Sequence, residues 1–286
     1  MPDFRLIALD IDGTLLNSER RITPRTREAI ASARRAGLLV VLATGRRRQS
    51  VAPIAADLGG EPILITTQGA AIWDGLQLIY YQPLAAAAAE RVVAHSLAEG
   101  VAALVLGSVL DGDYMYVAGP WQANERLRAY TERNRGQVQV YDPALLTDDP
   151  VFVFMMDDLH RLTAVHGRLA SDSGGEQHWR VIFSRTALAV GAALEALHPT
   201  VSKGAALHFL CQRLGLRPDQ ILAFGDNVND VEMLEFAGWG IAMSNASPEA
   251  IAAADRVTTG NDEDGIAIVL EELGLAPPWP SDAGER

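Results

Sequence analysis

Short continuous apolar runs alternate with amphipathic stretches in the first part of the chain. The runs are Leu6–Leu9, Leu38–Ala43 and Pro62–Ile65. Between the first two, Thr23 followed by a proline predicts the N-cap and first turn of a helix. Strands that are apolar throughout and are separated by helices are typical of a parallel sheet with both faces covered. We therefore expect a doubly wound parallel α/β sheet.

The pattern changes over residues 83–190. Strand candidates in this segment include alternating apolar and polar positions, which favours a sheet with one solvated face. The first pattern then returns, for example in the apolar run Ile221–Phe224. We therefore expect residues 1–82 and 191–286 to form one α/β core domain, and residues 83–190 to form a second α/β domain inserted into it.

Composition and charge narrow the function classes. With 286 residues, of which 49% are hydrophobic and 21% charged, the chain is typical of a soluble protein with two domains and a sizeable core. The net charge of −12, from 24 basic and 36 acidic residues, disfavours a nucleic-acid partner. No apolar run approaches the ~18 residues of a membrane span, so we expect no membrane partner.

Two further features of the sequence favour a cytoplasmic protein. The N-terminal segment lacks the basic start and the cleavage site of a signal peptide. The sole cysteine, Cys211, cannot form an internal disulfide, and its core-like spacing among apolar residues predicts a packed thiol.

The acidic run Asp262-Glu263-Asp264 is interpreted as capping a helix rather than as a second metal site.

Four polar clusters follow predicted strands or open a predicted helix. They are Asp10/Asp12/Thr14, Thr44-Gly45-Arg46, Ser202-Lys203-Gly204 and Gly225-Asp226-Asn227-Val228-Asn229-Asp230. Parallel strands deliver their carboxyl ends to one edge of the sheet, and ligands bind in the crevice there. We therefore expect the four clusters to converge, although they come from both ends of the chain.

The chemistry available to the converged clusters indicates phosphoryl transfer. The aspartates would repel one another unless a cation lay among them, and an all-oxygen site suits a hard ion, for which we expect Mg²⁺. Lys203 and Thr44 add a cation and a hydroxyl donor for the oxygens of a transferring phosphoryl group. A carboxylate can attack phosphorus, and a second carboxyl two residues away can act as general acid and then as general base.

The same clusters resemble four motifs of a known superfamily. Asp10-Ile11-Asp12-Gly13-Thr14-Leu15-Leu16 resembles the first motif of the haloacid dehalogenase (HAD) superfamily, which is rich in phosphatases. Thr44-Gly45-Arg46 resembles its second motif, Lys203 its third, and Gly225-Asp226-x-x-Asn229-Asp230 its fourth, in the family's order. The insertion resembles the large α/β cap of the Cof-type phosphatases. The resemblance spans nearly the whole chain and implies a HAD-like Rossmannoid core with an inserted cap.

The resemblance also implies roles for individual residues. Asp10 would be the nucleophile and Asp12 the general acid and base, while Thr44 and Lys203 would hold the phosphoryl oxygens. The implied metal ligands and their supports are Asp10, the backbone carbonyl of Asp12, Asp226, Asn229 and Asp230. The implied substrate-binding residues are Gly45, Arg46, Gln68 and Gly69, where Gln68-Gly69-Ala70 replaces the Asn-Gly-Ala of many relatives.

We therefore expect a Mg²⁺-dependent phosphatase that hydrolyses small soluble phosphomonoesters, such as sugar phosphates or phosphorylated cofactors, through an aspartyl-phosphate. The cap would close over the site to exclude water. Two alternatives stay open: a phosphomutase with the same aspartyl-phosphate chemistry, and a non-enzymatic regulator that binds a phosphometabolite. The acid at Asp12 argues against the second alternative, because a protein that only binds its ligand needs no group to give and take a proton. No feature of the sequence indicates an oligomeric state or names the substrate.

Overall fold

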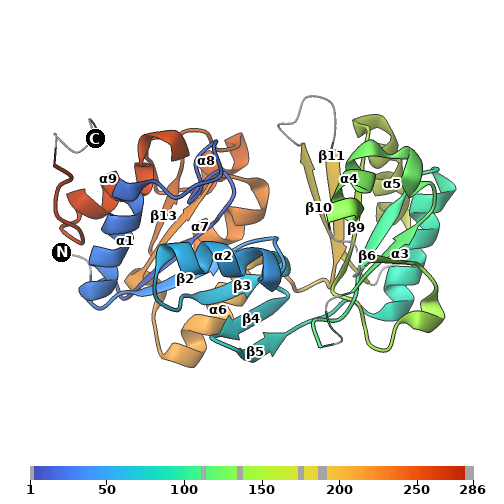
Figure 1. Ribbon diagram of the computed structural model, residues 1–286, viewed down its shortest axis with the longest axis horizontal. Coiled ribbons are helices and arrows are strands. Elements are labelled where there is room, and N and C mark those ends of the chain that lie inside the picture. The colour runs from blue at the N-terminus through green and yellow to red at the C-terminus, as the bar shows by residue number, and fades with distance from the viewer. Residues whose placement is uncertain are drawn as a thin grey trace. The chain divides into compact units, whose positions relative to one another are not determined.

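The computed structural model describes residues 3–110, 112, 114–133, 138–172, 177–185 and 192–280 (Figure 1). The chain divides into two compact units. The first is made of Met1–Tyr81 and Ser202–Arg286, and the second of Gln82–Val201. The second unit is therefore a segment inserted between the two parts of the first unit.

The first unit contains an eight-stranded sheet in the order β14-β13-β12-β1-β2-β3-β4-β5. Its strands are parallel except for β4 and β5, which pair antiparallel at one edge. The predicted doubly wound parallel sheet is confirmed, with this antiparallel hairpin added. The strands are β1 (Leu6–Leu9), β2 (Leu39–Ala43), β3 (Ile63–Thr66), β4 (Ala71–Asp74), β5 (Gln77–Tyr81), β12 (Ile221–Gly225), β13 (Trp239–Ala242) and β14 (Arg256–Val257).

Six helices of the first unit connect and cover these strands. They are α1 (Pro24–Arg35), α2 (Arg48–Leu58), α6 (Lys203–Leu214), α7 (Val231–Phe236), α8 (Pro248–Ala253) and α9 (Gly265–Glu272). The first helix begins as predicted, because the Thr23 hydroxyl oxygen accepts a hydrogen bond from the backbone N–H of Thr26 at 3.2 Å. Ser202 caps α6 in the same way, accepting from the N–H of Ala205 at 3.0 Å. This cap fixes the point at which Lys203 enters its helix.

The second unit contains a six-stranded sheet in the order β10-β11-β9-β6-β7-β8. Only the β7–β8 pair among these described strands is parallel. Helices α3 and α5 pack on one face of the sheet over a shared apolar core. The elements are α3 (Ala86–Ala98), β6 (Ala103–Leu106), β7 (Met115–Ala118), α4 (Glu125–Arg133), β8 (Val138–Val140), β9 (Phe152–Asp157), α5 (Leu159–Ser171), β10 (Arg180–Arg185) and β11 (Ala192–Leu197).

The inserted unit ends later than the sequence analysis expected. That analysis returned the chain to the core domain at residue 191, whereas the second unit extends to Val201. Residues 186–191 lie outside the described ranges, and the strand that follows them, β11, pairs antiparallel with both β9 and β10. An apolar strand fits either sheet, so its pairing partners, and not its composition, decide which unit it joins.

None of the helices in the described ranges combines the length and the apolar composition that a membrane crossing requires.

Cys211 lies in the core of the first unit, as its spacing predicted. Its side chain is 1% exposed, and burial raises the pKa of the thiol to about 12. A buried thiol that stays protonated is a poor nucleophile.

We therefore expect an aromatic disulfide reagent at about pH 8 to label Cys211 of the folded protein only as fast as the chain opens, and to label the urea-unfolded chain at once. Rapid stoichiometric labelling of the folded protein would contradict this placement.

Candidate active site

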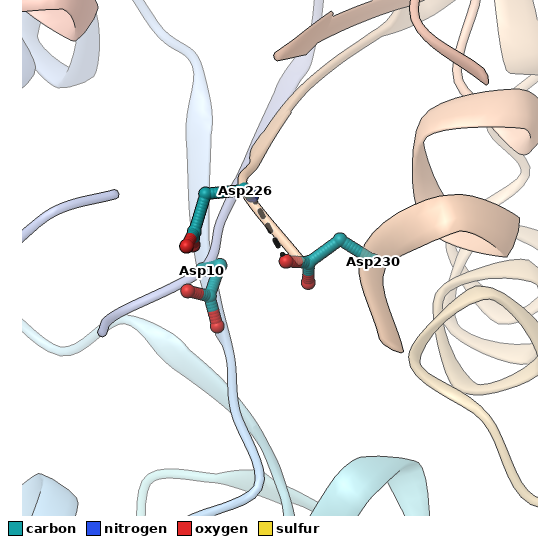
Figure 2. Close-up of side chains that lie close together, drawn as sticks. All are labelled: Asp10, Asp226 and Asp230. Carbon is teal, nitrogen blue, oxygen red and sulfur yellow. Dashed lines mark hydrogen bonds between the residues drawn. The ribbon is translucent and has the colours of Figure 1, made fainter. Parts of the chain in front are cut away.

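Three aspartates meet at the carboxyl ends of two neighbouring strands. β1 and β12 pair in parallel, so Asp10 and Asp226, which directly follow them, emerge at the same edge of the sheet. Asp230 ends a short 3₁₀ turn between β12 and α7. Figure 2 shows the three carboxyl groups together, and one oxygen of each lies within 4.8 Å of the others. The structure thus brings together three residues that the sequence analysis assigned to this edge.

Lys203 joins two of these aspartates through its ammonium group. Its Nζ lies 2.5 Å from Oδ1 of Asp10 and 2.7 Å from Oδ1 of Asp230, and its side chain is 1% exposed. Lys203 is the only lysine among the 24 lysine and arginine residues of the chain. An ammonium group donates three hydrogen bonds from one nitrogen, whereas a guanidinium is a larger planar group with its donors spread over three nitrogens. A site between two converging carboxylates therefore suits lysine.

Burial and charge shift the pKa values of this cluster. Burial raises the pKa of Asp10 well above its ordinary value, Lys203 opposes the shift, and the neighbouring aspartates add to it. Burial and then the charge of Asp230 raise the pKa of Asp226 to about 6, against the hydrogen bond from Thr14. Burial alone would lower the pKa of Lys203, but the two carboxylates outweigh burial and raise it. The cluster therefore holds more negative charge than one ammonium balances.

Backbone and hydroxyl groups fix Asp226 and Asp230 in place. The Thr14 hydroxyl donates to Oδ1 of Asp226 at 2.9 Å. Gly13 adopts φ +89°, and a Cβ at this position would lie 2.3 Å from Oδ2 of Asp226, so only glycine fits. Oδ2 of Asp230 accepts hydrogen bonds from the backbone N–H groups of Asp226 at 3.1 Å and Asn227 at 3.0 Å. Asp230 therefore both closes its own loop and binds Lys203.

Asp12, unlike the buried cluster, is exposed and pairs with Arg46. The guanidinium donates from Nε to Oδ2 at 2.6 Å and from its terminal nitrogen to Oδ1 at 2.5 Å. The Asp12 side chain is 57% exposed and that of Arg46 is 27% exposed. The hydrogen bonds with Asp12 raise the pKa of Arg46 above its ordinary value. The backbone N–H of Arg46 also donates to the buried Thr44 hydroxyl of its own cluster at 3.1 Å. The ion pair between Arg46 and Asp12 therefore joins the second cluster to the first.

Gln68 and Asn229 contact each other. The Asn229 side-chain amide donates to Oε1 of Gln68 at 2.9 Å, and the backbone N–H of Gln68 donates to the Thr44 carbonyl at 3.0 Å. A Cβ on Gly45 would lie 2.4 Å from Nε2 of Gln68. A Cβ on Gly69 would lie 2.2 Å from the backbone oxygen of Ser202, the residue before Lys203. These glycines therefore allow close packing between the clusters.

The sequence analysis missed Asn245, and its capping interpretation of the acidic run is confirmed at Glu263. Asn245 follows β13, a further parallel strand of the same sheet, and its amide donates to the Gly13 carbonyl at 2.9 Å. Its position soon after a parallel strand could have predicted that Asn245 lies at the same edge of the sheet as the other clusters. In the acidic run, Asp262 accepts from the N–H of Ser18 at 2.7 Å, and Asp264 accepts from the Thr26 hydroxyl at 3.1 Å. Asp264 is the N-cap of α9, at φ +60°, and makes no capping bond with its side chain. Glu263 does cap: it accepts from the backbone N–H of Gly260, the N-cap of the 3₁₀ helix Asn261–Glu263, at 3.1 Å.

The sequence model of the haloacid dehalogenase-like hydrolases matches residues 7–270 of the chain. The chain belongs to this family. A relative from Bacillus subtilis, the 5-amino-6-(5-phospho-D-ribitylamino)uracil phosphatase YwtE, is 31% identical over 300 residues, which cover 94% of this chain and 98% of the relative. The solved structure of a haloacid dehalogenase-like hydrolase from B. subtilis has 26% identity and a TM-score of 0.78, and covers 94% of this chain and 100% of the other.

This haloacid dehalogenase-like hydrolase also matches a longer plant protein. The chloroplastic endoribonuclease YBEY of Arabidopsis thaliana is 29% identical over 280 residues. The match covers 94% of this chain but 46% of that protein, so the chain spans about half of its length. The family resemblance stated from the four motifs is confirmed by the family match.

Replacing the lysine tests the buried ion pairs of this hydrolase. We expect Lys203→Met to lower the free energy of unfolding at neutral pH by about 3–5 kcal/mol, because two buried carboxylates lose their counter-charge. We expect Lys203→Arg to recover little of the loss, since the larger fork does not fit the same place. Urea denaturation followed by circular dichroism measures both. The exposed Arg217→Met is the control, with an expected change within about 0.5 kcal/mol; an equally small effect of Lys203→Met would contradict the role of the pair.

The raised pKa values predict how a divalent ion stabilises the fold. Because the folded state binds a proton on Asp226 more tightly than the unfolded state does, the metal-free protein loses this contribution as the pH rises through about 6. Mg²⁺ competes with that proton. We expect saturating Mg²⁺ to raise the melting temperature more at about pH 7.5 than at about pH 5.5. Asp226→Asn should remove most of the rise, and an equal rise at both pH values would argue against these carboxylates as ligands.

Proposed function

We propose that this protein is a Mg²⁺-dependent phosphatase that hydrolyses small phosphomonoesters through an aspartyl-phosphate on Asp10. The family and the phosphatase names of its relatives make phosphoric monoester hydrolase the enzyme class. One observation carries the proposed mechanism. A buried carboxylate, Asp10, lies at the carboxyl end of β1, bonded to the Lys203 ammonium and within 4.8 Å of an oxygen of each of two further carboxylates.

The donor set of this cluster fits a magnesium ion. The three carboxylates offer only oxygen atoms, and they carry more negative charge than Lys203 balances. We assign Asp10, Asp226 and the backbone carbonyl of Asp12 as ligands, with Asp230 and Asn229 supporting the metal ion or its waters. The bound ion would supply positive charge to the carboxylates and to the oxygens of the substrate phosphate.

The chain's own residues would carry the two chemical steps. An Asp10 oxygen attacks phosphorus, the bond from phosphorus to the leaving oxygen breaks, and Asp12 gives that oxygen a proton. Asp12, now a carboxylate, then takes a proton from water. That water attacks phosphorus, releases phosphate and restores Asp10. Lys203 and the Thr44 hydroxyl stabilise the charge on the phosphoryl oxygens.

The substrate class proposed is small and soluble: sugar phosphates or phosphorylated cofactors. The named substrate of the B. subtilis relative, a phosphorylated ribityl chain on a uracil ring, falls within this class. The net charge of −12 disfavours nucleic-acid substrates, and the free buried thiol of Cys211 favours a cytoplasmic location.

A phosphate-release assay tests the proposal directly. We expect the protein to release phosphate from members of a panel of small phosphomonoesters only when Mg²⁺ is present. Asp10→Asn should lower kcat by at least about 1,000-fold, because the nucleophile is lost while the fold is kept. The surface variant Asp74→Asn is the matched control and should behave as the wild type does.

Other outcomes of the same assay separate the alternatives. A folded wild type that releases no phosphate from any compound in the presence of Mg²⁺ contradicts the phosphatase proposal. Conversion of one sugar phosphate into its isomer would indicate a phosphomutase. Tight binding of a phosphometabolite without turnover would indicate a regulator.

A further inference from the structure

The turn between β3 and β4 holds three successive residues in left-handed backbone conformations. Thr67 has φ +51°, Gln68 φ +61° and Gly69 φ +102°. Only glycine adopts this region freely, and a β-branched threonine is an outlier there. Among the described residues none bonds the buried Thr67 hydroxyl. Such strain persists where the surrounding structure enforces it, and it is found disproportionately at functional sites.

Neighbouring segments of the active site enforce this turn. The N–H of Thr67 donates to the carbonyl of Arg46 at 2.9 Å, and that of Gln68 donates to the carbonyl of Thr44 at 3.0 Å. Gly69 lies against the backbone oxygen of Ser202, where a Cβ would approach within 2.2 Å. The turn is therefore fixed between the segment of Thr44 and the start of the helix that carries Lys203.

The Gln68 side chain extends this contact to a third segment. It is 6% exposed, and its Oε1 accepts from Nδ2 of Asn229 at 2.9 Å. Its Nε2 fills the space that a Cβ on Gly45 would occupy. The amide of Gln68 is therefore enclosed between Gly45 and Asn229.

The length of glutamine matters at this position. Asparagine tolerates the left-handed conformation better than glutamine does. An asparagine amide, one methylene shorter, would leave its oxygen about 4 Å from Nδ2 of Asn229, beyond hydrogen-bond distance. The chain thus uses the residue that suits the backbone less but reaches Asn229.

We propose that Gln68 is a positioning residue that orients Asn229, instead of a residue that binds the substrate. By accepting from Nδ2, Gln68 fixes which end of the Asn229 amide is oxygen, and directs Oδ1 away from itself, as a ligand for the metal ion or as a hydrogen-bond acceptor for one of its waters. It also sets the loop from Asp226 to Asp230 relative to Thr44. This role rests on the proposed function, because it presumes a metal ion beside that loop.

A double-mutant cycle tests the coupling. The variants are Gln68→Ala, Asn229→Ala and the pair, with exposed Gln77→Ala as the matched control. We expect each single variant to weaken Mg²⁺ binding, measured by calorimetric titration without substrate, by about tenfold. With para-nitrophenyl phosphate, kcat should fall by about tenfold while KM changes less than about twofold. The double variant should be no worse than the poorer single variant, since the two residues act as a unit.

Three results would overturn the positioning role. The first is multiplication of the two single effects in the double variant, which would mean that the residues act independently. The second is a raised KM with unchanged kcat in Gln68→Ala, which would indicate direct substrate binding. The third is a wild type that binds no Mg²⁺, which would remove the metal site and the positioning role together.

Gln68→Asn separates positioning from stability. We expect this variant to melt at or above the wild-type temperature, because asparagine relieves the backbone strain, and yet to bind Mg²⁺ as weakly as Gln68→Ala. Wild-type Mg²⁺ affinity in Gln68→Asn would overturn the argument from length. Because melting and Mg²⁺ titration use no substrate, they decide the role of Gln68 even if the wild type releases no phosphate, a result that would overturn only the proposed function.

Discussion

The rest of the site depends on the buried ion pairs of Lys203. Its ammonium joins Asp10 and Asp230, which lie 193 and 27 positions away in the sequence. The two carboxylates are buried, and removing the lysine would leave both of them without a counter-charge. The ends of β1 and of the loop after β12 must therefore meet the first turn of α6. The parallel sheet supplies this arrangement, since β1 and β12 are neighbours in it.

The same interaction makes the site incomplete without a cation. One lysine balances one carboxylate of three. Burial first, and then the charge of the neighbouring carboxylates, raises the pKa of both Asp10 and Asp226. A divalent ion would turn this excess charge into binding energy. The surrounding contacts prepare the carboxylates for it: the hydroxyl of Thr14 holds Asp226, and Gly13 leaves room for it. Strain and charge are thus concentrated where the phosphate would bind.

The sequence predicted the features that follow from periodicity and missed those that depend on side-chain reach. Continuous apolar strands predicted the parallel sheet, and the sheet predicted that Asp10 and Asp226 would meet at one edge. No local pattern indicates that Arg46 pairs with Asp12, 34 residues away, or that Asn229 reaches Gln68, 161 residues away. Both contacts depend on the reach of flexible side chains, and the second also depends on a turn in which Thr67 and Gln68 adopt a left-handed conformation that their residue types disfavour. Likewise, β11 is apolar enough for either sheet, so the end of the inserted unit could not be placed from composition.

The contrast between Asp10 and Asp12 explains how two aspartates so close in sequence would divide the chemistry. The chain leaves the sheet after β1, so Asp10 remains buried against Lys203 while Asp12 reaches the solvent side, where Arg46 holds it. A nucleophile benefits from a fixed, water-poor setting, in which its charge is balanced by the lysine and by a metal ion. A group that gives and then takes a proton must instead exchange with water between steps. Two residues of spacing, with glycine at the turn that follows, are enough to give the two aspartates different environments, each suited to the step proposed for it.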